Sequence, residues 1–216
     1  MTTAYRFLTP DGWYRYRTAD AGPSMAQRFV ERHIPMLAKR SDLPERDRVV
    51  ARQRAERDIE RALSGLRDIG TADVFFFDGQ FGGYRANMMI TVTAAYLGPK
   101  VAELRSDDLA AGLGGDLIEL PAGPAVRTRD SISSTLAGAS GDTTTPDGLL
   151  AYTSALRGDE DAAGTLDQTR VEYLIRVPDE SGTFVVVSFR GVGTDFVDQR
   201  VAHFDILMSG FAWTTA

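Results

Sequence analysis

The hydrophobic pattern predicts an α+β fold, a two-layer sandwich with an antiparallel sheet of about six strands and helices packed on one face. Three observations support this prediction. Helical periodicity dominates up to about residue 70, alternation with period 2 dominates in the following segments, and helical periodicity returns near the C-terminus. Successive strands joined by short turns pair antiparallel, so the helices at the two ends of the chain are expected to cover the sheet.

The first third of the chain is predicted to hold strand and helix. Residues 5–17 are typical of a short strand or hairpin around a Pro-Asp-Gly turn. A helix over about 24–39 should be kinked or shortened by Pro35. A longer helix is expected over about 44–67, and its narrow apolar stripe consists of Ala51, Ala55, Ile59, Ala62, Leu63 and Leu66.

The remainder is predicted to be mostly strand. The strand-like segments are 74–77, 88–96, 117–120, 125–129, 171–177 and 184–190, of which the last two form the clearest hairpin. A helix capped by Asp195 and a short strand or packed tail at 211–213 should end the chain. The consecutive rings of Phe75, Phe76 and Phe77 cannot share one sheet face. We expect the segment 130–165 to cover the outlying ring, and an interaction surface is the alternative.

The chain is predicted to be a single domain over residues 1–216. Residues 134–165 are interpreted as a long loop excursion or insertion, because two segments rich in Gly, Ala, Asp and Thr flank an apolar piece at 149–156. The strand pattern resumes after this excursion, which argues against a domain boundary.

Composition excludes several classes of function. The net charge is −6, with 14 Lys and Arg against 10 Asp and Glu in residues 1–70 and 10 against 20 in the rest. An acidic chain is repelled by phosphate backbones, so no nucleic-acid partner is expected. No apolar stretch reaches the length of a membrane span, and the N-terminus lacks a signal-peptide core. The predicted location is therefore cytoplasmic, and the preference for Arg over Lys is typical of a GC-rich bacterial genome.

Few side chains are available for chemistry. The chain has no cysteine and two histidines. His33 is interpreted as a surface or boundary residue, and His203 as a structural residue beside Asp205. The acidic run 159–161 lacks the ligand spacing of a calcium loop. The glycines at 112–115 and 191–193 match no phosphate-binding motif and are read as turns. We therefore predict no metal, no cofactor and no enzymatic activity.

Four segments together resemble a known group of proteins. They are Phe7-Leu-Thr-Pro-Asp-Gly-Trp13, Leu120-Pro-Ala-Gly-Pro-Ala-Val-Arg127, the strand from Val171 to Pro178, and Phe204-Asp-Ile206 with Phe211-Ala-Trp213. This pattern is similar to an uncharacterised actinobacterial family whose shape resembles the Mog1/PsbP-like sandwich. The resemblance implies one antiparallel sheet with packed helices and a role in binding or assembly, and it carries over no catalytic residues.

The leading hypothesis is a non-enzymatic protein-binding or assembly module with a protein partner, such as an accessory, chaperone or immunity-type factor of a bacterial secretion system. One alternative is a small-ligand carrier or hydrolase with a pocket under the long loop. The other is a structural subunit of a larger assembly. The residues expected to contact a partner lie on the exposed side of the long helix: Arg46, Gln53, Arg57 and Glu60. Partner identity and oligomeric state are left open.

Overall fold

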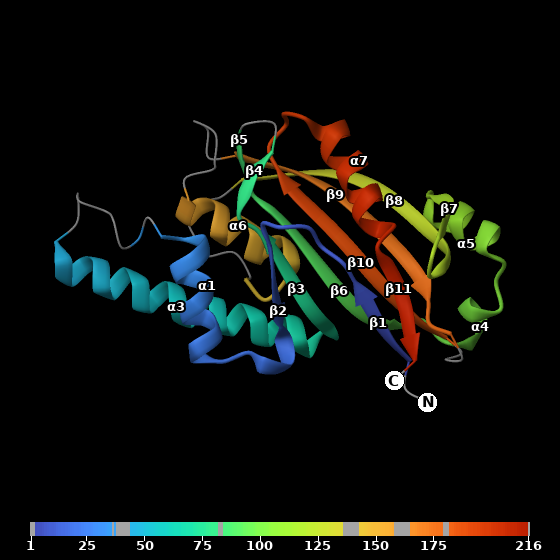
Figure 1. The fold of residues 1–216 in the computed structure, drawn as a ribbon, viewed down its shortest axis with the longest axis horizontal. Coiled ribbons are helices and arrows are strands. Elements are labelled where there is room, and N and C mark those ends of the chain that lie inside the picture. Colours follow the sequence, from blue (N-terminus) through green and yellow to red (C-terminus); the bar gives the residue numbers. More distant parts are fainter. Residues whose placement is uncertain are drawn as a thin grey trace.

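A computed structural model of the 216-residue chain describes residues 3–35, 37, 44–81, 84–135, 143–157, 165–178 and 182–215. The described residues confirm the α+β prediction (Figure 1). The main sheet has seven strands in the order β2-β3-β6-β10-β9-β8-β7, with antiparallel neighbours throughout. Its strands are β2 (Trp13–Arg17), β3 (Thr71–Phe77), β6 (Met88–Tyr96), β7 (Asp116–Leu120), β8 (Gly123–Thr135), β9 (Thr165–Arg176) and β10 (Thr183–Val192).

Two small sheets accompany the main one. β1 (Thr3–Phe7) pairs with β11 (Phe211–Thr215), and β4 (Gly79–Phe81) pairs with β5 (Tyr84–Ala86). Residues 5–17 therefore contain two strands in different sheets and no hairpin. Aromatic packing favours the pairing of β1 with the C-terminal strand β11. The ring of Tyr5 stacks on the ring of Phe211 at a centroid distance of 5.4 Å.

The helices cover the sheet unequally. They are α1 (Pro23–His33), α3 (Glu45–Asp68), α4 (Pro99–Ala102), α5 (Ser106–Leu113), α6 (Pro146–Arg157) and α7 (Val197–Met208), with a 3₁₀ turn η1 (Thr18–Asp20). Apolar residues of α1, α3 and α6 form one buried cluster with one face of the sheet, and α5 packs over β8 on the same face. α7 and the pair β1–β11 cover the opposite face.

The sequence periodicities account for most element boundaries. α1 ends at His33, two residues before Pro35, as the proline predicts. The stripe residues of α3 from Ala55 to Leu66 are buried against the sheet. α7 begins after Phe196, which has φ of 55°, and no side chain caps it, so the predicted cap at Asp195 is wrong.

The three consecutive phenylalanines divide between the two faces. Phe75 and Phe77 belong to the cluster under α7, whereas Phe76 points the other way and is fully buried. The ring of Phe76 meets Phe29 of α1 edge-on, with 4.7 Å between centroids. The cover for the outlying ring therefore comes first from α1, and the triplet offers no exposed interaction surface.

The middle of the excursion 134–165 is a packed helix. Leu149 and Leu150 of α6 are fully buried in the cluster with α1 and α3. Thr145 accepts a hydrogen bond from the Gly148 backbone N–H at 3.1 Å, which caps the start of the helix. The acidic run 159–161 lies outside the described residues.

Candidate functional site

An open cleft of about 550 Å³ lies between edge strand β2 and helix α1. Alternation along β2 directs the side chains of Tyr14 and Tyr16 toward α1, because both rings contact His33 on that helix. Helical spacing places Arg28 and Arg32 one turn apart on the exposed side of α1. The lining residues are Tyr14, Arg15, Tyr16, Arg28, Glu31, Arg32 and Asp78.

Two tyrosines form the aromatic part of the cleft. The Arg32 guanidinium lies over the Tyr14 ring, 3.8 Å from its centroid, which is a cation–π contact at a partly exposed position. The Tyr16 hydroxyl is hydrogen-bonded to His33 Nε2 at 2.8 Å. Burial raises the pKa of Tyr16, so its hydroxyl stays neutral at ordinary pH.

The prediction that His33 is a surface or boundary residue is wrong, because His33 is fully buried. It stands four residues after Phe29 and shares that residue's inward phase on α1. The backbone carbonyl of His33 also accepts a hydrogen bond from Arg157 Nε at 2.7 Å. His33 thereby connects the floor of the cleft to α6.

The cleft is basic even though the whole chain is acidic. Glu31 is bound by Gln27 and by Arg52 of α3, and these hydrogen bonds lower the pKa of the Glu31 carboxyl. The Arg15 guanidinium is held at 2.7 and 2.6 Å by both oxygens of buried Asp73. Because Glu31 and Arg15 are paired within the fold, the charges of the cleft that face solvent come mainly from Arg28 and Arg32 of α1.

Arg28 and Arg32 supply the available positive charge. Both side chains are exposed, and neither forms an ion pair with any residue that the structure describes. An exposed guanidinium retains its donors for a carboxylate, which it can bind with two parallel hydrogen bonds. The cleft thus combines aromatic rings, cations and an open shape.

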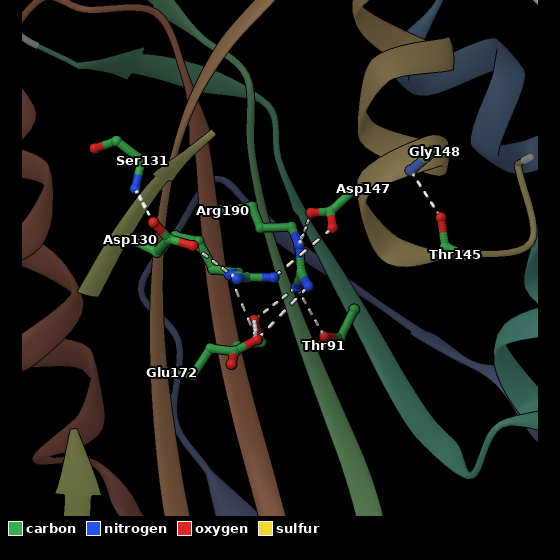
Figure 2. Close-up of polar contacts among 10 residues, drawn as sticks. Thr91, Asp130, Ser131, Thr145, Asp147, Gly148, Glu172 and Arg190 are labelled. Atoms are coloured by element: carbon green, nitrogen blue, oxygen red, sulfur yellow. Dashed lines mark hydrogen bonds and ion pairs between the residues drawn. The ribbon is translucent and has the colours of Figure 1, made fainter. Parts of the chain in front are cut away.

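A second polar cluster lies on the sheet beneath α6 (Figure 2). Arg190 of β10 is almost fully buried and donates to Asp147 Oδ1 at 2.6 Å and to Ser188 Oγ at 2.6 Å. Glu172 lies 3.8 Å from the same guanidinium. Arg170 of β9 binds Asp130 at 2.9 Å beside it. The charges in this cluster are paired with one another, and Asp147 fixes the start of α6 to the sheet.

The other residues singled out in the sequence have structural surroundings. His203 is half-buried, and burial lowers its pKa. Asp205 accepts hydrogen bonds from Tyr173 and, at 2.7 Å, from Arg127. Gly114 and Gly193 have positive φ of 64° and 97°, as turn glycines do. Within the part of the chain that the structure describes, no group of three or more His, Asp or Glu residues could hold a metal ion.

The structure places the four predicted contact residues outside the cleft. Arg46, Gln53 and Arg57 are exposed on α3, and Glu60 is partly exposed on the same helix. None of them lines the cleft. They remain a candidate contact surface on a different part of the molecule.

Sequence reasoning did not identify Tyr14, Arg28 and Arg32. The available signal was the spacing of the two arginines on the polar side of an amphipathic helix. Their meeting with Tyr14 depends on how α1 packs beside β2, which no local pattern encodes.

None of the described helices is long and apolar enough to cross a membrane. A scan against protein-family models, a search of curated proteins and a search of solved structures each returned no match for the chain.

Proposed function

We propose that the chain is a non-enzymatic protein-binding module that holds an acidic segment of a partner protein in the cleft between β2 and α1. The observation that carries this proposal is the exposed pair Arg28 and Arg32 beside the Tyr14 ring, in a chain whose net charge is −6. Arg and Tyr are, with Trp, the side chains enriched at the energetic hot spots of protein interfaces.

The form of the cleft favours a macromolecular partner over a small molecule. Small-molecule sites are enclosed and mostly apolar, with a few convergent polar groups. This cleft is open, and five of its seven lining residues are Arg, Glu or Asp. The shape suits a segment that lies across the surface while its acidic side chains reach the two arginines.

Three more specific predictions from the sequence are part of the same proposal. They are kinship with the Mog1/PsbP-like sandwiches, a cytoplasmic location, and a role as an accessory, chaperone or immunity-type factor of a secretion system. The fold class supports the first prediction, since the chain has an antiparallel sheet with helices packed against it.

Selection from a library of random dodecapeptides tests the proposal. The wild-type protein should enrich peptides rich in Asp and Glu. The double variant Arg28→Glu/Arg32→Glu should bind them at least about tenfold more weakly, because two attractive contacts become repulsive and about 1.4 kcal/mol corresponds to a factor of ten. The matched control is Arg46→Glu/Arg57→Glu, which makes the same change in net charge on the exposed side of α3.

The control distinguishes the two candidate surfaces. Binding within about twofold of wild type in the α3 control, together with loss in the cleft variant, supports the cleft. The reverse pattern would place the contact on Arg46 and Arg57. Absence of any enriched peptide would contradict the proposed function.

A further inference from the structure

The free edge of β2 has a definite hydrogen-bonding phase. The Asp78 backbone N–H donates to the Gly12 carbonyl at 2.7 Å, one pair beyond the register Trp13↔Phe77. In an antiparallel ladder, bonded and non-bonded pairs alternate. Tyr14 and Tyr16 therefore exchange backbone bonds with β3, whereas the N–H and C=O groups of Arg15 and the N–H of Arg17 point away from the sheet. Arg17 is the N-cap of the 3₁₀ turn η1, so its carbonyl is not counted among these outward groups.

These outward groups are available to another strand. β2 is the terminal strand of the seven-stranded order. Among the backbone hydrogen bonds of turns and loops in the described residues, none engages Arg15 or the N–H of Arg17. An edge strand with such groups is a template for strand addition unless it is blocked.

The cleft lies along this same edge. Three consecutive β2 residues, Tyr14 to Tyr16, line it, and α1 forms the opposite wall with Arg28 and Arg32. An extended chain next to β2 would sit about 4.8 Å from it and direct every second side chain toward the α1 side. Acidic residues at those positions would meet the two guanidinium groups.

We infer that the acidic partner segment binds as an added β-strand along the edge of β2, with alternate acidic side chains directed at Arg28 and Arg32. This inference rests on the proposed function and specifies its geometry. Main-chain hydrogen bonds supply the affinity, and the two arginines select for acidic residues, as in other cases of strand addition. Charge complementarity identifies the occupant, because both exposed arginines lie beside the free edge.

The test probe is a synthetic heptapeptide of alternating Glu and Val, acetylated and amidated at its ends. Two isomers of the probe carry backbone N-methyl groups at alternate positions, one set on the odd residues and one on the even residues. Only the set that faces β2 removes donors to the added ladder. We expect one isomer to bind like the parent and the other at least about tenfold more weakly, because several main-chain bonds are lost together.

A substitution in the protein gives an independent test. Arg17 has φ of −80° and ψ of 123°, which proline can adopt, and its N–H is outside the β3 ladder. Arg17→Pro removes this outward donor, and Arg17→Ala is the matched control that removes only the side chain. The proline variant should bind the probe about three- to tenfold more weakly than the alanine variant. Circular dichroism checks that both variants remain folded.

The possible results separate this inference from the proposed function. Equal binding of the two N-methyl isomers, or equal binding of the Pro and Ala variants, would overturn strand addition even when acidic peptides are still selected through Arg28 and Arg32. No binding of the parent probe at millimolar concentration would also overturn it, and the library selection then decides the proposed function by itself. A wild-type oligomer that Arg17→Pro dissociates in light scattering would assign the edge to a second copy and contradict the inference.

Discussion

The contact between Arg190 and Asp147 is predicted to hold α6 on the sheet. In Asp147→Asn, the Arg190 side chain, which is 5% exposed, loses its closest carboxylate and keeps Glu172 at 3.8 Å. Loss of a hydrogen bond between charged groups costs about 1.5–3 kcal/mol. We expect Asp147→Asn to lower the free energy of unfolding by about 2–3 kcal/mol. This loss is smaller than the cost of breaking a fully buried ion pair, because the Asp147 side chain is 39% exposed.

A double-mutant cycle separates this contact from other effects. In Arg190→Met, Asp147 regains water, so the loss should be smaller, about 1–2 kcal/mol. Asp147→Asn in the Arg190→Met background then reports the charge at the start of α6 together with the 3.9 Å ion pair between Asp147 and Arg170, about 0.3–1 kcal/mol. Urea unfolding monitored by circular dichroism measures all four proteins. We predict a coupling energy of about 1.5 kcal/mol, and additivity within about 0.5 kcal/mol would refute the role assigned to Arg190.

Three further predictions concern the core, pH and the cleft. Phe76→Ala should lower the free energy of unfolding by about 3–5 kcal/mol, because the ring is fully buried. Tyr96→Ala is the control, and because Tyr96 is 71% exposed it should change that free energy by less than about 0.5 kcal/mol. Equal effects of the two substitutions would contradict the burial of Phe76 between the sheet and α1. Because burial lowers the pKa of His203 below its ordinary value of 6.5, the unfolded chain takes up the proton first, and stability should fall as the pH drops below 6.5. Replacement by Gln should flatten that part of the stability profile, and an unchanged profile in His203→Gln is the adverse result. Tyr14→Leu should weaken binding of selected acidic peptides about twofold to fivefold in fluorescence anisotropy by removing the ring under Arg32, and unchanged affinity would exclude that ring from the contact.

The local periodicity of apolar residues predicts most of the helices and strands and which of their faces are buried. Alternation in 88–96 assigned Met88, Ile90 and Val92 to one face and Met89 to the other, and the two buried clusters divide in the same way. The apolar stripe of α3 and the end of α1 near Pro35 can also be predicted from the sequence, because both depend on residues only a few positions apart. The α+β class followed from the order of these segments.

Contacts between residues far apart in the sequence cannot be predicted from local periodicity. β1 pairs with β11 across almost the whole chain, and the rings of Tyr5 and Phe7 on β1 both contact Phe211 on β11. The depth of His33 likewise depends on contacts with Tyr16 and Phe76, which come from two separate strands. Such contacts are tertiary, so composition and spacing carry little information about them.

The candidate site illustrates the same limit. Sequence reasoning selected Arg46 and Arg57 because they lie opposite an apolar stripe, a criterion that any solvated helix face meets. Arg28 and Arg32 satisfy the same criterion on α1. What distinguishes them is the edge strand beside their helix and the Tyr14 ring beneath Arg32, and both features arise from packing.

An amide NMR titration of the wild-type protein with the acidic Glu-Val heptapeptide tests directly whether the peptide adds to the edge of β2. We predict that the largest shifts map to β2 and α1, and that the amides of Arg15 and Arg17 become protected from hydrogen exchange as they gain partners. The amides of Tyr14 and Tyr16, already bonded to β3, should change little in protection. Shifts centred on Arg46 and Arg57 of α3, or unchanged exchange at Arg15 and Arg17, would contradict this prediction.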